Sequence, residues 1–466
     1  MNRTELKSLI LICIACLASP CYVVAGRTKT NKTTTANRWP DGKLMDSWFS
    51  DIRRVQLDTL GKRYVITDYG VAADSTLVQT AAIQAVIDQA ASHGGGVVVV
   101  PRGTYMSGAL FFRPGTHLVV ESGGKLKGSD RIANFPVVET RIEGQTCRYF
   151  AALINADRCD GFTIAGGGTI DGNGHHYWEE FWIRREWNPQ CTNKDAQRPR
   201  LVYVSNSANV TIQDVRLTNS PFWTNHIYRS HHVRFIGCTI TSPTSGVKAP
   251  SSDAIDVDAC HDVLVDGCYM SVNDDAVAIK GGKGTWADKA PENGPNSEIL
   301  IQNCHYGSVH SCLTLGSESV NSRNIVMRGI RVERAQRVLW LKMRPDTPQH
   351  YEYVAVDNVE GRSGSFLVVR PWTQFFAPSE RKDMPLSQCN NILISNIRME
   401  TDNFFDVGTS DKYALRNFSF SHIRVSDKGM RFDRSLIEGT KEDDVVISPR
   451  TTGNGLKTTG DADGLH

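Results

Sequence analysis

The chain has 466 residues, of which 40% are apolar, and its 52 Lys and Arg residues balance 50 Asp and Glu residues. This apolar content is sufficient for a buried core and excludes a globally disordered chain. The net charge of +2 provides no general attraction to nucleic acid or to an anionic membrane surface, so we expect neither as a partner.

The first 25 residues have the pattern of an export signal. Two basic residues, Arg3 and Lys7, precede an uninterrupted apolar run at 9–18, and small residues stand just before Gly26. Such a run is too short to cross a bilayer but matches the apolar region of a cleaved signal peptide. We therefore expect residues 1–25 to be removed and the protein to be secreted or periplasmic. An N-terminal membrane anchor is the alternative.

Residues 26–60 are predicted to form a polar N-terminal segment. A short strand at 64–66 follows, and then a helix is indicated by apolar residues on one stripe, namely Val78, Ala82, Ile83, Val86, Ile87 and Ala90. Asp74 or Ser75 can cap the start of this helix, and the glycines at 94–96 end it. We expect the helix to cover an open end of the sheet structure that follows, where bare strand edges would invite aggregation.

From about residue 205 a short pattern recurs, with apolar residues at a first position and again two, five and seven positions later. Three copies are Val210/Ile212/Val215/Leu217, Val233/Phe235/Cys238/Ile240 and Ile299/Ile301/Cys304/Tyr306. Each copy predicts two short strands separated by a bend. Only stacked copies can bury their apolar sides, so the pattern predicts an all-β, single-stranded, right-handed parallel β-helix over 61–435. An antiparallel sandwich or propeller fits poorly because hairpin signals are missing. Residues 436–466 are predicted to be a flexible C-terminal tail.

Nine cysteines remain after residue 25, and this odd number cannot pair completely within one chain. Cys238, Cys268 and Cys304 occupy equivalent repeat positions, which favours unpaired thiols stacked in the core. No pair of cysteines has the spacing of a zinc site, so we expect no metal and no other cofactor.

Three carboxylates stand out among the repeats. Asp253 precedes the pair Asp274 and Asp275 by about one coil, so stacking can bring all three together. Like charges on one face raise the pKa of at least one carboxyl group, and a protonated acid beside ionised carboxylates is what glycoside hydrolysis requires. Alone, the pair could equally be a polar turn or a set of Ca²⁺ ligands.

Further charged residues follow coil by coil, and this order favours a catalytic site. His310, about one coil later, can tune the carboxylates, and Lys342 with Arg344, another coil later, can hold an anionic sugar. Lys280 is close enough to Asp275 in sequence to contact a sugar carboxylate as well. The stretch 276–309 is predicted to include a long loop that could wall off the cleft and favour cleavage from chain ends.

These motifs resemble glycoside hydrolase family 28, the polygalacturonase family, over roughly residues 60–430. Segments 140–144 and 168–172 are similar to exo-acting, bacterial-like members. The family motifs Asn-Thr-Asp, Asp-Asp, Gly-His-Gly and Arg-Ile-Lys are matched, in part, around Asp253, Asp274 with Asp275, His310 and Lys342. The resemblance implies a pectin-lyase-like solenoid and a metal-free, inverting hydrolysis. In it, Asp274 protonates the leaving oxygen, while Asp253 and Asp275 hold and deprotonate the water.

The sequence departs from the family at the last motif, where Trp340 replaces the arginine. In the family that arginine and the lysine bind a galacturonate carboxylate on the leaving side. A tryptophan cannot make a bidentate contact with a carboxylate, but it offers an apolar face to a sugar ring. The leaving-side sugar could therefore be neutral, for example rhamnose, although Arg344 lies on the same strand side and could compensate.

The leading interpretation is a secreted O-glycosyl hydrolase that cleaves α-galacturonide linkages of a pectic polysaccharide or oligosaccharide from chain ends, acting as a monomer without a membrane span. One alternative is a rhamnogalacturonan hydrolase with a neutral leaving-side sugar. Another is a solenoid that binds carbohydrate without catalysis, which the intact carboxylates disfavour. Elimination by a lyase would need a Ca²⁺ cluster and a basic arginine.

Overall fold

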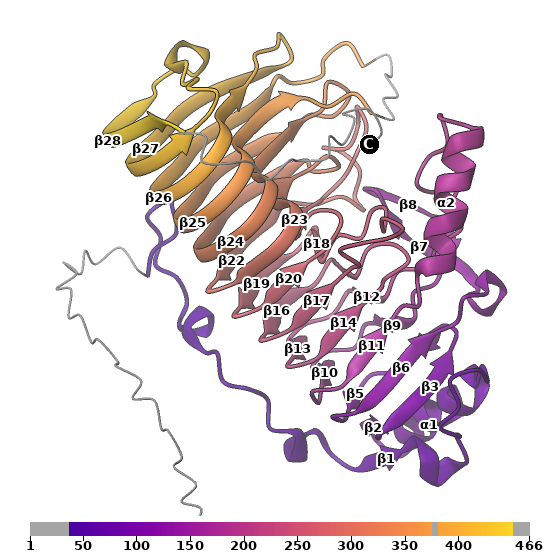
Figure 1. Ribbon diagram of the computed structural model, residues 1–466. Coiled ribbons are helices and arrows are strands. Elements are labelled where there is room, and N and C mark those ends of the chain that lie inside the picture. The colour runs from indigo at the N-terminus through magenta and orange to yellow at the C-terminus, as the bar shows by residue number, and fades with distance from the viewer. Residues whose placement is uncertain (1–36, 375–380, 451–466) are drawn as a thin grey trace, which may run out of the picture. The chain divides into compact units, whose positions relative to one another are not determined.

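The computed structural model describes residues 37–374 and 381–450. The predicted signal peptide and the last part of the predicted tail lie outside these ranges. The described residues from 38 onward form one compact unit, in which successive coils stack into a parallel β-helix (Figure 1). Across 37–374 and 381–450, no helix combines the length and the apolar character needed to cross a membrane.

Equivalent strands of successive coils pair in parallel and form three ladders. The first ladder contains β1 (Arg63–Val65), β2 (Gly96–Val100), β5 (Thr116–Val120), β10 (Thr163–Ala165), β13 (Thr211–Gln213), β16 (His231–Ile236), β19 (His261–Asp266) and β22 (Asn296–Gln302). The second contains β3 (Gly103–Ser107), β6 (Gly124–Gly128), β11 (Thr169–Asp171), β14 (Arg216–Thr218), β17 (Thr239–Thr241) and β20 (Tyr269–Ser271). The third contains β4 (Leu110–Phe111), β9 (Ile154–Asp157), β12 (Val202–Ser205), β15 (Asn225–Tyr228), β18 (Ile255–Asp258) and β21 (Val277–Ile279).

In the later coils single long strands pass through more than one ladder. They are β23 (His305–Leu315), β24 (Asn321–Met343), β25 (His350–Pro371), β26 (Ser387–Val407) and β27 (Tyr413–Asp427). Short 3-10 helices lie at Ser47–Ser50, Leu57–Leu60, Ile66–Tyr69, Ile132–Asn134 and Arg434–Leu436.

The predicted repeat forms the core. The second apolar position of each copy lies in the first ladder and the fourth in the second, so that Ile212 aligns with Phe235 and Leu217 aligns with Ile240. These side chains are fully buried. All nine cysteines of the described residues are free thiols. The parallel β-helix and the unpaired core thiols are therefore confirmed.

Helix α1 (Thr80–Ser92) packs its buried stripe, which includes Ile83 and Ile87, against the main core at the N-terminal end of the β-helix. The predicted caps are wrong. The helix begins after Gln79, which makes no side-chain cap, and the Asp74 carboxylate accepts hydrogen bonds from the backbone of the preceding turn instead.

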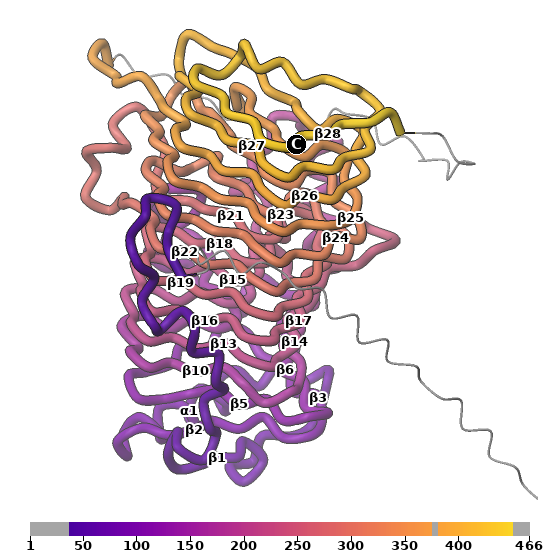
Figure 2. The backbone as a smooth tube through the Cα atoms, turned by 90° about the vertical axis from the view of Figure 1, so that its left-hand side faces the viewer, coloured from indigo at the N-terminus to yellow at the C-terminus, as the bar shows by residue number. Residues whose placement is uncertain are grey.

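The part of the predicted polar segment that the structure describes is not a separate segment. Residues 38–60, here called the N-terminal strap, run along the outside of the first ladder from the later coils back to β1 (Figure 2). Trp39 and Phe49 are 4% and 3% exposed. They pack on the outward-facing side chains Leu264, Leu300 and Val326 of three successive coils. The predicted boundary between a polar segment and the β-helix at residue 60 is therefore not seen for residues 38–60. A few apolar residues, and not the average composition, decide where the strap lies.

We expect Phe49→Ala to lower the free energy of unfolding by about 3 kcal/mol, since the side chain is buried in the strap interface and its removal leaves a cavity. Urea unfolding of the two proteins would measure this change. Ile52→Ala, at a 42% exposed position in the same strap, is the control and should change it by less than about 0.5 kcal/mol. Equal stability of Phe49→Ala and the parent protein would show that the strap is not docked in solution.

The predicted flexible tail is also corrected at its start. Residues 441–449 form β28 (Lys441–Pro449), which pairs in parallel with β27. Val445 and Ile447 pack against the core and cover the edge of the last coil. Alternation of apolar residues in this short stretch outweighs the polar composition around it.

Two insertions stand beside the third ladder (Figure 1). One is the antiparallel hairpin of β7 (Val137–Ile142) and β8 (Gln145–Phe150), and the other is α2 (His175–Trp187). The hairpin is anchored by Arg141, whose side chain is 1% exposed and lies 3.1 Å from the buried Asp258 carboxylate of β18. This ion pair holds the hairpin over the strands that carry the predicted catalytic residues.

Candidate active site

The register of the third ladder determines how the predicted residues meet. Ile255 of β18 aligns with Val277 of β21, and Val277 aligns with Leu313 of β23. Two positions before these residues lie Asp253, Asp275 and Ser311, which therefore occupy equivalent places in successive coils. Asp274 and His310 share the place one residue earlier. The spacing of about one coil thus places the three carboxylates together, as the sequence predicted.

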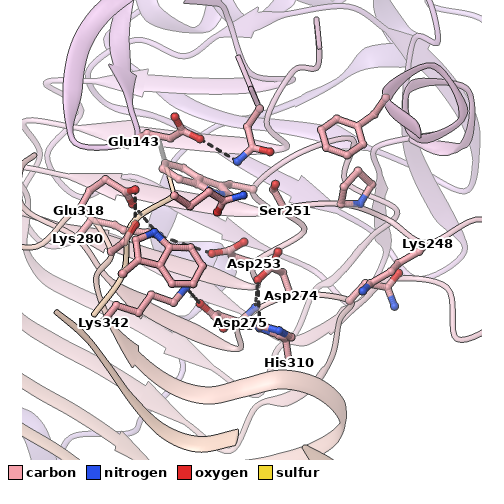
Figure 3. A pocket seen from close by; sticks show the side chains of 18 of the residues that line it. Glu143, Lys248, Ser251, Asp253, Asp274, Asp275, Lys280, His310, Glu318 and Lys342 are labelled. Atoms are coloured by element: carbon pink, nitrogen blue, oxygen red, sulfur yellow. Dashed lines mark hydrogen bonds and ion pairs between the residues drawn. The ribbon is translucent and has the colours of Figure 1, made fainter. Parts of the chain in front are cut away.

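These residues line one pocket (Figure 3). Its carboxylates are Glu143, Asp253, Asp274, Asp275 and Glu318; its cations are Arg185, Lys248, Lys280 and Lys342; its aromatic residues are Phe181, Trp182, Trp223 and Trp372. His310 lies at its floor, 4% exposed. The structure therefore brings together all four residues predicted to be catalytic, with Lys280 and Lys342.

Asp275 is a buried carboxylate held in its ionised form. Its Oδ2 lies 3.3 Å from the Lys342 ammonium, and its Oδ1 lies 3.4 Å from Nδ1 of His310. Burial alone would raise the pKa of Asp275, but Lys342 and His310 together hold it well below its usual range. A carboxylate that stays ionised in a water-accessible pocket can accept a proton from water.

Asp253 has the opposite environment. Burial, reinforced by the carboxylates of Asp256 and Asp274, raises its pKa well above the usual range. Burial likewise raises the pKa of Asp256, 3.6 Å from Lys280, to about 8. At neutral pH this part of the pocket therefore holds protons. Neighbouring carboxyl groups whose pKa values are pushed apart are typical of acid and base pairs in active sites.

Lys280 lies between these acids and Glu318. Its ammonium is 3.8 Å from Asp253 and 3.6 Å from Glu318, and Trp223 lies under it with its ring centroid 5.0 Å away. Burial alone would raise the pKa of Glu318, but Lys280 lowers it to about 2. The charge of Lys280 is thus balanced mainly by ionised Glu318, which leaves the protons on Asp253 and Asp256.

The group Asp274, Asp275 and His310 has its ligand atoms within 4.8 Å of one another, which is close enough for one cation. Positive charge is already present there. The Lys342 ammonium lies on Asp275, and Arg337 donates a hydrogen bond to the other ring nitrogen of His310. A divalent cation would be repelled by both, so this group does not fit a metal site.

The site lies in a part of the chain with known relatives. Residues 122–338 match the family model described as glycosyl hydrolases family 28, and this match contains Asp253, Asp274, Asp275 and His310. Over these residues, a little under half of its length, the chain is similar to glycosyl hydrolases of family 28. Residues 63–156 match a second model, described as rhamnogalacturonase A/epimerase, pectate lyase-like.

The curated relatives are distant. A probable polygalacturonase of Vitis vinifera is 27% identical over 54% of this chain and 51% of its own length. An endo-polygalacturonase of Pectobacterium carotovorum subsp. carotovorum is 27% identical over 48% and 54% of the two lengths. The chain thus spans about half the length of these relatives. An exopolygalacturonase of Platanus acerifolia is 21% identical over 75% and 83%.

Solved structures confirm the right-handed parallel β-helix. A hyperthermoactive exopolygalacturonase from Thermotoga maritima superposes with a TM-score of 0.69 at 20% identity, over 86% of this chain and 95% of that one. The polygalacturonase of Erwinia carotovora ssp. carotovora gives 0.61 at 18% identity, over 82% and 94%. At these identities the likeness concerns the fold alone.

Two predicted substrate-binding residues, Trp340 and Arg344, do not line the pocket. The side chain of Arg344 is fully buried and forms an ion pair with Asp346, 2.6 Å away. Arg344 follows the last residue of β24, so strand alternation no longer directs its side chain to the pocket. The prediction that it binds a sugar is therefore wrong.

Trp340 is also covered. Its ring is 5% exposed and lies between His310, Trp372, Arg337 and Lys342, with the two cations each 4.0 Å from its centroid. It therefore packs against Lys342 and His310, whereas Trp372 is one of the four aromatic residues that line the pocket. The prediction that the Trp340 ring offers its face to a sugar is therefore wrong, because the ring is covered and does not line the pocket.

Several residues that line the pocket were not predicted from the sequence. Glu143 is at the tip of the β7–β8 hairpin, where it and Gly144 both have positive φ, 48° and 70°. Such a two-residue turn favours glycine, and a glutamate there is strained. The turn directs the Glu143 carboxylate into the pocket, where Asn193 donates a hydrogen bond of 2.9 Å to it. No periodic pattern could have placed it, because the hairpin interrupts the repeat.

Proposed function

We propose that the protein hydrolyses α-galacturonide linkages of pectin from chain ends and inverts the anomeric configuration. The observation that carries this proposal is the pair of opposed carboxyl environments in one pocket, with Asp275 ionised and Asp253 protonated beside Asp274. Asp275 takes a proton from the attacking water, and Asp253 holds that water by hydrogen bonding. Asp274, the most exposed of the three, protonates the leaving oxygen.

Action from chain ends is supported by how the pocket is closed. A Cβ atom added to Gly144 would lie 2.7 Å from Cβ of Glu318 and 3.0 Å from the backbone of Gly282. The hairpin tip is therefore in close contact with the loop that follows β21. In Figure 3, Glu143 lies above the three aspartates, and Lys342 lies beside Asp275. A polysaccharide end that reaches the aspartates meets a wall at Glu143, which leaves room for its terminal sugars only.

A product assay on homogalacturonan and rhamnogalacturonan I tests the proposal. We expect saturated galacturonic acid as the first product from homogalacturonan, with little early loss of viscosity because internal bonds stay intact. Asp274→Asn, assayed in parallel, excludes a contaminating activity. Early release of intermediate oligosaccharides would contradict action from chain ends, and products that absorb in the ultraviolet would indicate a lyase and contradict hydrolysis.

A rhamnogalacturonan hydrolase is the second candidate. Lys342 is engaged by Asp275 and stacked between Trp340 and Trp372, with ring centroids 4.0 and 4.7 Å away, and Arg344 is sequestered by Asp346. This surface suits a neutral leaving-side sugar better than a second uronate. Activity confined to rhamnogalacturonan I in the same assay would select this candidate.

The protein is further proposed to be exported as a monomer after cleavage before Gly26. This rests on the sequence of residues 1–25, which lie outside the described residues. N-terminal sequencing of the exported protein would test the cleavage, and an intact Met1 would contradict it.

A further inference from the structure

His310 is held on both sides of its ring. Its Nδ1 lies 3.4 Å from Oδ1 of Asp275 and 3.8 Å from Oδ1 of Asp274. On the opposite edge, Nη1 of Arg337 lies 2.8 Å from Nε2 of His310. The backbone N–H of His310 also donates to the carbonyl of Asp274, so the ring and the catalytic turn move together.

The chemistry of arginine decides which nitrogen carries the proton. A guanidinium group can donate hydrogen bonds but cannot accept them, so Nε2 of His310 must be the acceptor. A neutral imidazole with an acceptor at Nε2 has its proton at Nδ1. That proton points at Asp275 and Asp274. A doubly protonated ring would place two donors, the ring N–H and the guanidinium N–H, against each other.

The same arrangement occurs a second time in the molecule, away from the pocket. Nη1 of Arg200 lies 2.6 Å from Nδ1 of His226, and Nε2 of His226 lies 3.3 Å from Oδ2 of Asp258. Burial lowers the pKa of His226 to about 4, so this ring is neutral and lies between an arginine donor and an aspartate acceptor. Both sites therefore use an arginine to fix which nitrogen of a histidine is protonated.

We propose that Arg337 is a positioning residue that fixes the Nδ1–H tautomer of His310 and so directs its single proton to the catalytic carboxylates. A neutral His310 donates its Nδ1 proton to Asp275 and adds no positive charge next to Asp274. Lys342 supplies the remaining positive charge on Asp275, and the Trp340 ring lies against both Arg337 and His310. For its kinetic effect, this inference rests on the proposed function.

The tautomer is observed directly by ¹⁵N NMR of protein labelled at histidine, with the His310 signals assigned from a His310→Gln variant. In the parent protein we expect a protonated Nδ1 and an unprotonated Nε2. Arg337→Met should move the proton to Nε2 or add one there, whereas Arg337→Lys, which keeps a donor, should retain the parent pattern. Arg334→Met, an exposed arginine on the same strand, is the control. A protonated Nε2 in the parent protein would overturn the proposal, whatever the substrate is.

Kinetics then test whether Arg337 acts through His310. We expect Arg337→Met to lower kcat roughly 10- to 100-fold with little change in KM, a part of the ~10²–10⁴ that acid and base groups contribute. In a His310→Ala background the same substitution should lower kcat by less than about twofold, because the imidazole through which Arg337 is proposed to act is gone. Equal losses in both backgrounds would overturn the proposal. Unfolding curves confirm that each variant is folded. If Arg337→Met is not folded, the tautomer of His310 in the parent protein still tests the proposal.

Discussion

Asp274→Asn is expected to lower kcat by about 10²–10⁴-fold, because the amide cannot supply the proton that the leaving oxygen needs. The substitution keeps the shape of the side chain, and the amide oxygen can still accept the 3.0 Å hydrogen bond from the backbone N–H of Asp275. The turn that carries Asp275 should therefore stay in place. Release of reducing sugar from homogalacturonan measures the loss.

The matched control is Asp68→Asn, which removes one exposed carboxylate at the N-terminal end of the β-helix and should leave kcat within about twofold of the parent. Both variants should unfold at the same denaturant concentration as the parent protein. If folded Asp274→Asn turned over substrate at the parental rate, Asp274 would not be the acid, and the protonated Asp253 would be the next residue to test.

Lys342→Met is expected to move the acidic limb of the kcat/KM profile to higher pH by about one to three units. Burial opposes ionisation of Asp275, and Lys342 is the largest contribution that lowers its pKa. Without the ammonium this pKa rises. Asp275 must be ionised to take a proton from water, so activity at the acidic end is lost first. The pH dependence of kcat/KM reports this group in the free enzyme.

Lys248→Met is the control for Lys342→Met, because Lys248 lines the same pocket and, within the described part of the chain, has no ion pair with Asp275. It should change KM for an anionic substrate without shifting the acidic limb. An unshifted limb in Lys342→Met would mean that Asp275 is kept ionised by His310 and Lys280 alone, or that Asp275 is not the base.

The fold could be predicted because each coil repeats one pattern of burial. Apolar residues at fixed offsets, such as Ile212 and Leu217, specify two of the three ladders and the stacking of coils. The same regularity places Asp253 near Asp275, since a separation of one coil along the chain becomes adjacency in the ladder. Arg344 shows the limit of this reasoning, because alternation of side chains ends where the strand ends, at Met343.

The remaining pocket residues depend on how insertions dock, which the repeat does not encode. Glu143 enters through a hairpin anchored by an ion pair between Arg141 and Asp258, residues separated by 117 positions. Asp256 could have been predicted from the sequence, because it is a charged residue between two apolar core residues, Ile255 and Val257, of the strand that follows Asp253. Trp372 is close to the pocket only because β25 follows β24 around the coil.

The N-terminal strap changes how the β-helix holds together. In a solenoid each coil contacts only its neighbours, so stability resembles a one-dimensional chain that can fray or unfold in parts. The strap binds side chains from at least three successive coils at once and also reaches back to Asp214 through Arg54. Coils that are distant along the ladder therefore contact the same strap. Unfolding of one of these coils weakens the contacts between the strap and the other coils. Such long-range coupling favours a single cooperative unfolding transition over stepwise fraying, and it means that the first residues of this unit find their place only after the middle coils have formed.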